Sequence, residues 1–133
     1  MGVIVLIEKD GKILLIKRKK TIGRGAWCLP GGKLEMNESL ENCTKREVRE
    51  ETRLSVDNLE LISITNDVAY GLHYVTIAFK ANKIESQVKI TDEKVEEIKW
   101  FDLGNLPEHL YIATKKVIEN YLAKRIYKKD NVK

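Results

Sequence analysis

The order of apolar and polar positions along the chain predicts short strands and two helices. Apolar runs at residues 3–8 and 12–17 flank the pair Asp10-Gly11, a combination that favours a β-hairpin with a tight turn. Further elements are expected as strands at 59–65, 73–80 and 97–101 and as a helix at 110–122. Strands in hairpins combined with two separated helices indicate an α+β layered domain with a mixed sheet.

Another predicted helix has glutamates where its apolar side should be. It is expected to begin at a cap on Asn37 or Ser39 and to run to about Arg53. At about 100° per residue, its apolar stripe consists of Leu40, Cys43 and Leu54, with Glu47 and Glu51 inside the stripe and Glu50 at its edge. An amphipathic helix normally places apolar residues at such positions.

Two interpretations of these glutamates stay open on the helix alone. Unpaired buried carboxylates cost several kcal/mol each, and a divalent cation such as Mg²⁺, which prefers hard oxygen ligands, would offset that cost. Spacings of three and four residues bring the three carboxylates to one patch. The alternative is a solvated face on which the glutamates pair with Lys45, Arg46 and Arg49.

Composition is that of a single globular domain spanning residues 1–133. Hydrophobic residues make up 43% of the chain and charged residues 33%. The first apolar run is too short for a signal peptide or a membrane span, so we expect a cytoplasmic protein without membrane contacts. In that reducing compartment Cys28 and Cys43 are expected to be free thiols.

The net charge of +4 comes mainly from two basic clusters. The cluster from Lys17 to Arg24 runs into a glycine-rich stretch, 23–33, which predicts a loop that suits anionic phosphates. The C-terminal cluster lacks the interleaved aromatic residues of a stacking surface, so we expect a solvated helix face there and no nucleic-acid binding.

The stretch from Gly32 to Leu54 resembles the Nudix box, G-x5-E-x7-R-E-U-x-E-E-x-G-U, in which U is a bulky apolar residue. The matching residues are Gly32, Glu38, Arg46, Glu47, Val48, Glu50, Glu51 and Leu54. Arg53 stands where the pattern has glycine, and we expect a slightly altered helix end without loss of chemistry.

The resemblance implies roles for residues of the box. Glu47, Glu50 and Glu51 would bind Mg²⁺, which Mn²⁺ can replace, together with the carbonyl of Gly32. Arg46 would orient a catalytic glutamate, and Glu38 would hold a metal-bound water. The general base would be Glu50 or one of Glu93, Glu96 and Glu97. An ordinary surface ion pair remains the alternative for Arg46.

Residues outside the box are expected to bind the substrate. Gly31 and Gly32 would approach it through their backbone, and Arg18 would contact a phosphate unless it is only a surface arginine at a strand end. Trp27, Tyr74 and Phe79 could line a base pocket, although aromatic residues in strands are more often part of the core.

Most of the chain, including Leu14–Arg18, Gly25–Gly32 and Thr65-Asn66-Asp67, is similar to Nudix enzymes that hydrolyse (deoxy)nucleoside triphosphates to monophosphates. The resemblance implies an α/β/α sandwich, a small-molecule nucleotide as partner, and either a monomer or a homodimer. Alternative substrates are ADP-ribose, a nucleotide sugar and a dinucleoside polyphosphate. Tyr70 favours the last of these. A nucleotide-binding module without catalysis is a further alternative.

Overall fold

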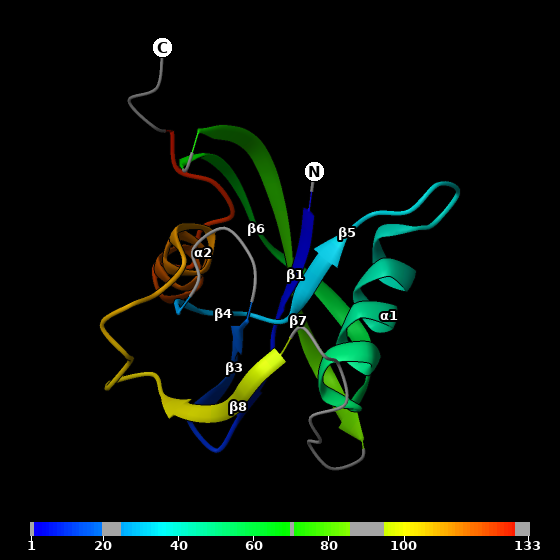
Figure 1. The fold of residues 1–133 in the computed structure, drawn as a ribbon, viewed down its shortest axis with the longest axis horizontal. Helices are drawn as coiled ribbons and strands as arrows, with labels where there is room; N and C mark the ends of the chain where they lie inside the picture. The colour runs from blue at the N-terminus through cyan, green and yellow to red at the C-terminus, as the bar shows by residue number, and fades with distance from the viewer. Residues whose placement is uncertain (1, 20–24, 70, 86–94, 130–133) are drawn as a thin grey trace.

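The computed structural model describes residues 2–19, 25–69, 71–85 and 95–129. The elements are β1 (Gly2–Leu6), β2 (Glu8–Lys9), β3 (Lys12–Arg18), β4 (Trp27–Cys28), β5 (Gly31–Lys33), α1 (Leu40–Thr52), β6 (Ser55–Ala69), β7 (Leu72–Glu85), β8 (Val95–Asp102) and α2 (Ile112–Leu122). Strands at the centre separate α1 from α2, so the expected α/β/α sandwich is confirmed (Figure 1). None of the helices among these residues is long and apolar enough to cross a bilayer.

Two sheets form the central layer. The first sheet has the strand order β5-β1-β7-β6, in which β1 and β7 are parallel and the other pairs are antiparallel. The second sheet joins β2, β3 and β4, and β8 also pairs with β3. The mixed sheet predicted from the sequence is therefore confirmed, with each of the three strands expected at 59–65, 73–80 and 97–101 longer than predicted.

The first predicted hairpin is only partly correct. Strand β2 does pair with β3 across the turn, where Asp10 and Gly11 have positive φ angles of 54° and 77°. The run 3–8, however, is two strands that belong to different sheets. The chain passes between them at Ile7, which is fully buried and whose carbonyl accepts a hydrogen bond from Leu14 N–H. Continuous apolarity identified a buried segment but gave no signal of that sheet change.

The two faces of the first sheet carry separate cores. On the α1 face, Val3, Val5 and Phe79 pack with Val48 and Leu54. The core on the α2 face contains Leu6, Ile62, Ala78, Val117 and Ile118. Alternation along β1 and β7 divides the side chains between the faces. Phe79, a candidate for base stacking, is thus a core residue, 6% exposed.

Candidate functional site

The helix that carries the glutamates begins and ends at defined caps. Ser39 is the N-cap, and its hydroxyl accepts a hydrogen bond from Asn42 N–H at 3.0 Å. Asn37, the alternative cap, has a positive φ of 63° in the turn before the helix. These contacts fix the rotation of α1, so Glu47 and Glu51 face the sheet.

The altered helix end expected at Arg53 is not observed. Arg53 takes the left-handed conformation, with φ 64° and ψ 8°, and its N–H donates to the Arg49 carbonyl. The next residue, Leu54, is buried in the core, and its N–H donates to the hydroxyl of fully buried Thr52 at 3.1 Å. Because both neighbours are anchored, the backbone holds Arg53 in a conformation that normally favours glycine.

Strand β5 lies against α1 through two adjacent glycines. A Cβ atom on Gly32 would lie 2.3 Å from Cδ of Glu47, and one on Gly31 would lie 2.1 Å from the carbonyl oxygen of Val3. The first clash is with the end of a flexible side chain, whereas the second is with backbone. Gly32 therefore makes room for the Glu47 carboxylate, and Gly31 makes room for β1.

The Glu51 side chain is 1% exposed and both of its oxygens are hydrogen bonded. Oε1 accepts from Gly31 N–H at 2.9 Å, and Oε2 accepts from the Arg18 guanidinium, which also donates to the Gly31 carbonyl at 2.8 Å. Burial raises the pKa of Glu51 to about 7, although Arg18 opposes that shift. Arg18, at the end of β3, thus joins the second sheet to α1 and β5.

Arg46 binds several acceptors around the start of the helix. Its guanidinium donates to both oxygens of Glu38, at 2.7 and 3.0 Å, and to Glu47 Oε1 at 2.8 Å. It also lies 3.5 Å from Glu50 and 3.2 Å from the Lys33 carbonyl. The hydrogen bonds from Arg46 lower the pKa of Glu38 to about 2, and burial raises the pKa of Glu47.

The solvated-face alternative applies to only one of the three glutamates. Glu50 has a side chain that is 52% exposed and forms the i,i+4 pair with Arg46. The side chains of Glu47 and Glu51 are 16% and 1% exposed, and Glu51 pairs with Arg18 from another element. The helix therefore directs two carboxylates inward and keeps one at the surface.

A divalent cation fits the residues at this edge, although the described part of the chain has no group of three Asp, Glu, His or Cys side chains close enough to hold one. Glu51 is drawn to Arg18 and Glu47 to Arg46. The Arg18 guanidinium occupies a position between a Glu51 oxygen and the Gly31 carbonyl, so a cationic group already bridges two hard oxygen donors. These donors are all oxygens, which is the set that Mg²⁺ prefers.

Strand pairing distinguishes the two glycine carbonyls. Val5 N–H donates to the Pro30 carbonyl at 2.9 Å, and Gly31 and Gly32 then pair with Ile4 and Val3. In an antiparallel ladder, alternate pairs turn their polar groups toward and away from the partner strand. The Gly32 groups therefore face β1, whereas the Gly31 N–H and carbonyl face Glu51 and Arg18.

The other predicted site residues that the structure describes, Trp27, Glu96 and Glu97, lie on strands of the second sheet, and Glu97 pairs with Lys17, the neighbour of Arg18. Glu97, on β8, is half exposed and lies 3.9 Å from Lys17, and Glu96 is exposed. Trp27 is 9% exposed, packs edge-on against Phe101 and has Lys17 over its ring. Glu93, Tyr70 and Arg24 lie outside the described residues.

Two features were missed by the sequence interpretation. Nothing in the sequence indicated the pairing of Arg18 with Glu51, which are 33 positions apart. Asp67 was quoted only as part of a resemblance, yet it is fully buried on the other face of the sheet. Its position two residues after Thr65 in an alternating strand was the available signal, because an acidic residue on an inward-facing position requires partners.

Comparison with known proteins places this geometry in context. A model of the NUDIX domain matches residues 1–121. An ADP-ribose pyrophosphatase of Methanocaldococcus jannaschii is 39% identical over 119 residues, which are 88% of this chain and 69% of that protein. An oxidized purine nucleoside triphosphate hydrolase of Danio rerio is 34% identical, with 78% of this chain and 67% of that protein covered. The chain spans 44% of the length of an NAD-capped RNA hydrolase NudC of Pseudomonas aeruginosa, to which it is 32% identical over 127 residues.

A solved structure agrees over nearly the full length of both chains. The crystal structure of a MutT NUDIX hydrolase from Burkholderia pseudomallei superposes with a TM-score of 0.85 at 33% sequence identity. The match covers 90% of this chain and 95% of that one. The layers and the strand order therefore belong to a fold that has been observed directly.

Proposed function

This chain belongs to the Nudix family, and we propose that it is a divalent-metal-dependent pyrophosphohydrolase of a (deoxy)nucleoside triphosphate. As a Nudix hydrolase it acts on a phosphoanhydride bond, and in this proposal the products are a nucleoside monophosphate and pyrophosphate. The observation that carries the proposal is the contact between β5 and α1, where Gly32 leaves room for Glu47 and Gly31 faces Glu51. This contact supports the proposal because it brings oxygen atoms of strand β5 and of helix α1 close together.

Glu47, Glu50 and Glu51 would hold Mg²⁺, and we assign the backbone ligand to the Gly31 carbonyl in place of Gly32. When bound, the ion would neutralise phosphate oxygens and lower the pKa of a water molecule. Arg18 would release Glu51 and donate to a substrate phosphate, for which a guanidinium is well suited. Arg46 would keep the Glu47 carboxylate oriented through its hydrogen bond at 2.8 Å.

The general base is assigned to Glu50, because of the three glutamates assigned to the metal it is the one with a side chain that is mostly exposed, at 52%. A base must reach the water that attacks phosphorus, and an exposed carboxylate one turn from Glu47 can do so. Glu96 and Glu97 remain rival bases on β8. Trp27, together with the Gly31-Gly32 backbone, stays a predicted substrate contact.

ADP-ribose is the second candidate substrate, and one observation favours it. The Methanocaldococcus jannaschii relative, at 39% identity, is an ADP-ribose pyrophosphatase. Both substrates contain a diphosphate that could lie along the β5 edge. The two substrates differ in the group that is attached to the second phosphate. The carboxylates on α1 do not distinguish between these groups.

The proposal is tested with a nucleotide panel in Mg²⁺, resolved by product. We expect dCTP or dGTP to be cleaved to a monophosphate and pyrophosphate. The rate of this cleavage should exceed the rates for ADP-ribose, a diadenosine polyphosphate and GDP-mannose. Faster cleavage of ADP-ribose or of the dinucleotide would transfer the assignment to that class. Orthophosphate plus a diphosphate would contradict cleavage inside the chain, and no turnover with Mg²⁺ or Mn²⁺ would leave a binding module.

A further inference from the structure

A buried carboxylate on the α2 face of the first sheet has one oxygen that lacks a hydrogen bond. Asp67, on β6, is 0% exposed, and its Oδ2 accepts from the hydroxyls of Thr65 and Thr76 at 2.9 and 2.8 Å. Among the described residues its Oδ1 has no hydrogen-bond partner. The nearest cation is Lys116 Nζ, 3.6 Å away, which itself donates to the Asn66 carbonyl at 2.7 Å. Buried polar atoms are rarely left in this state, so Oδ1 is suited to accept from a ligand.

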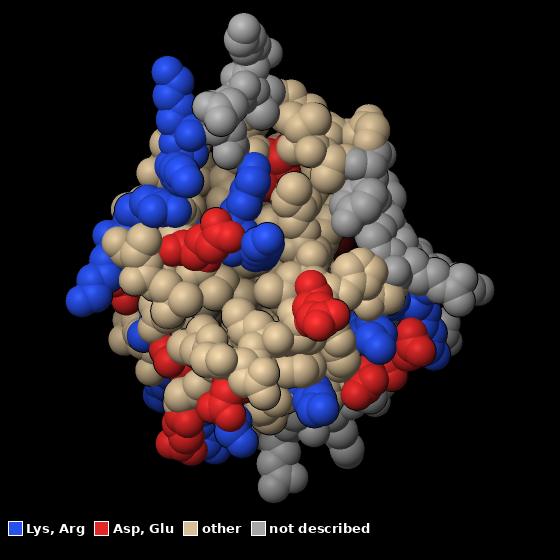
Figure 2. Space-filling view, turned by 90° about the vertical axis from the view of Figure 1, so that its left-hand side faces the viewer, with Lys and Arg blue, Asp and Glu red and all other residues tan. Residues whose placement is uncertain are grey.

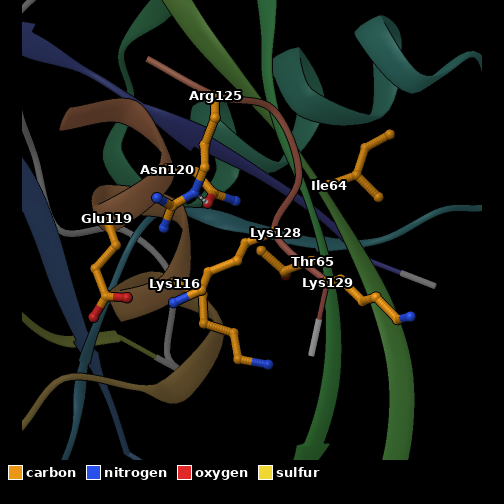
Figure 3. Close-up of a pocket in the computed structure, with 8 residues that line it drawn as sticks. All are labelled: Ile64, Thr65, Lys116, Glu119, Asn120, Arg125, Lys128 and Lys129. Carbon is orange, nitrogen blue, oxygen red and sulfur yellow. Dashed lines mark hydrogen bonds between the residues drawn. The ribbon is translucent and has the colours of Figure 1, made fainter. Parts of the chain in front are cut away.

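The residues that surround Asp67 also line a cavity. Thr65 and Lys116 form part of the wall of a hollow of about 160 Å³ between β6, α2 and the segment that follows α2 (Figure 3). The other lining residues are Ile64, Glu119, Asn120, Arg125, Lys128 and Lys129. Asp67 is therefore in contact with two side chains of the wall. Figure 2, which faces the α2 side, shows Lys and Arg gathered toward one edge of this face.

Strand register links this carboxylate to the catalytic edge. Thr65 pairs with Thr76, Thr76 pairs with Gly2, and Gly2 pairs with Lys33 of β5. Directly paired residues share a face of the sheet, so these four positions form one row on the α2 face. Three strand spacings separate β5 from β6, roughly 14 Å in all. A nucleotide with its phosphates at β5 is long enough to bring its base to this end of the row.

The row has least side-chain bulk at Gly2, where a nucleotide would cross it, and is buried at its far end, where Thr76 and Thr65 are 2% and 4% exposed. Gly2 has no side chain, and a Cβ placed there would meet only the Gly32 carbonyl oxygen, at 3.6 Å. The far end of the row carries the hydroxyl groups of Thr76 and Thr65. Both hydroxyls donate to Oδ2 of Asp67, and neither donates to Oδ1. The polar end of the row is thus built around a single acceptor.

We propose that Asp67 is a specificity-determining residue, whose Oδ1 accepts a hydrogen bond from the exocyclic amino group of a nucleobase. The inference rests on the proposed function, since it takes the phosphates to lie at β5. Lys116 is a second base contact, which donates to the ring nitrogen next to that amino group, because its Nζ lies 3.6 Å from Oδ1. Cytosine and adenine both present an amino group beside a ring nitrogen that accepts.

A carboxylate distinguishes amino from oxo bases by simple electrostatics. An amino group donates to Oδ1, whereas an oxo group in the same place would bring two acceptor oxygens together in a buried site. A site built to bind a donor rejects the analogue that lacks it, because its own polar group is left unpaired. Oδ2 cannot compensate, since two hydroxyl donors already occupy it.

The test uses two pairs of nucleotides that differ only at this position, CMP with UMP and AMP with IMP, and ribose 5-phosphate as a base-free control. Binding is measured by calorimetry or NMR in Mg²⁺, so turnover is not required. We expect the amino member of the pair whose ring fits to bind about tenfold more tightly or better. Asp67→Asn should remove or reverse that preference, because a carboxamide can donate, while ribose 5-phosphate binding should not change.

Two variants control for folding and for a general loss of binding. Lys116→Gln should reduce binding of the amino nucleotide, and, with a side chain that is 26% exposed, it should not unfold the protein. Asp57→Asn changes an aspartate on the same strand that is exposed and pairs with Lys45, so it should alter no affinity.

Three outcomes would overturn the inference. In the first, Asp67→Asn keeps the preference of the wild type for the amino nucleotide. In the second, Asp67→Asn loses the same amount of affinity for both nucleotides of the pair and for ribose 5-phosphate. In the third, the wild type binds neither pair of nucleotides. If Asp67 controls the preference but no nucleotide is hydrolysed, the proposed function fails and this inference stands.

Discussion

The two faces of the first sheet each bury a carboxylate beside a cation, and they complete its hydrogen bonding differently. On the α1 face both oxygens of Glu51 are bonded, one to Gly31 N–H and one to Arg18. On the α2 face Asp67 has two hydroxyl donors on one oxygen, and its other oxygen, 3.6 Å from Lys116 Nζ, has no hydrogen-bond donor among the residues that the structure describes. The protein itself completes the hydrogen bonding of the first carboxylate. In our proposals a cation releases Glu51 from Arg18 at the first site, and a ligand supplies the donor at the second.

The largest expected effect comes from removing the charge on the α1 face. Glu51→Gln and Glu50→Gln should each reduce kcat by roughly a hundredfold or more, because second-shell changes alone at metal sites cost up to that amount. Both variants should fold, since Glu50 is mostly exposed and burial opposes the charge of Glu51 more strongly than Arg18 favours it. Glu41→Gln, on the exposed side of the same helix, is the matched control. Near-normal turnover in either variant would refute the ligand assignment.

The adjacent glycines should separate activity from stability. Gly32→Ala is expected to fold and to lose most activity, because its Cβ displaces the flexible Glu47 carboxylate. Gly31→Ala should instead be destabilised by roughly 3 kcal/mol or more, as for an overpacked site, since its Cβ would meet the backbone of Val3. Urea unfolding and steady-state kinetics on both variants decide this. Equal losses of stability would show that Glu47 cannot move aside.

The pH dependence of stability should arise from the α1 face. Because burial raises the pKa of Glu51 to about 7, the folded protein retains a proton that the unfolded chain loses near pH 4.5. Without metal, the contribution of Glu51 to the free energy of unfolding should thus be largest below about pH 4.5 and fall by up to about 3 kcal/mol as the pH rises to 7. Urea unfolding in EDTA between pH 5 and 8 measures this. Glu51→Gln should flatten the curve, and an unchanged slope would assign it to other groups.

A smaller effect is expected from β8, which belongs to the second sheet. Glu97→Gln and Glu96→Gln should slow catalysis less than Glu50→Gln does, because Glu97 is half exposed and lies near Lys17. The pH–rate profile identifies the base. If the acidic limb disappears in Glu97→Gln and persists in Glu50→Gln, the two roles must be exchanged.

The smallest effect concerns the end of α1 and should leave both sites unchanged. Arg53→Gly should raise the free energy of unfolding by about 1 kcal/mol, because Arg53 has a left-handed backbone at φ 64° that glycine adopts without steric cost. Arg53→Ala keeps the Cβ and should bring no such gain. A gain in Arg53→Ala equal to that in Arg53→Gly would attribute the effect to the arginine side chain.

Local patterns predicted the elements well, and the contacts between distant segments were beyond them. Ser39 and the spacing of α1 were readable because capping and helical periodicity act within a few residues. The split of the run 3–8 at Ile7 was not, because the apolar residues of β1 continue without interruption through Ile7 to the start of β2. The role of Gly31 depends on its register with Ile4, and the partner of Glu51 comes from another sheet. Such pairings are set by the packed structure.

The two buried cysteines can serve as probes of local opening in two different parts of the molecule. Both thiols are free, Cys43 is 0% exposed on the buried side of α1, and Cys28 is 6% exposed on β4. Burial raises the pKa of Cys43 to about 12 and also raises that of Cys28, so neither is a thiolate in the native protein at neutral pH. An alkylating reagent therefore modifies each one only when its surroundings open. The labelling rate of Cys43 would report how often the helix that carries the glutamates opens. The labelling rate of Cys28 would report the opening of the second sheet.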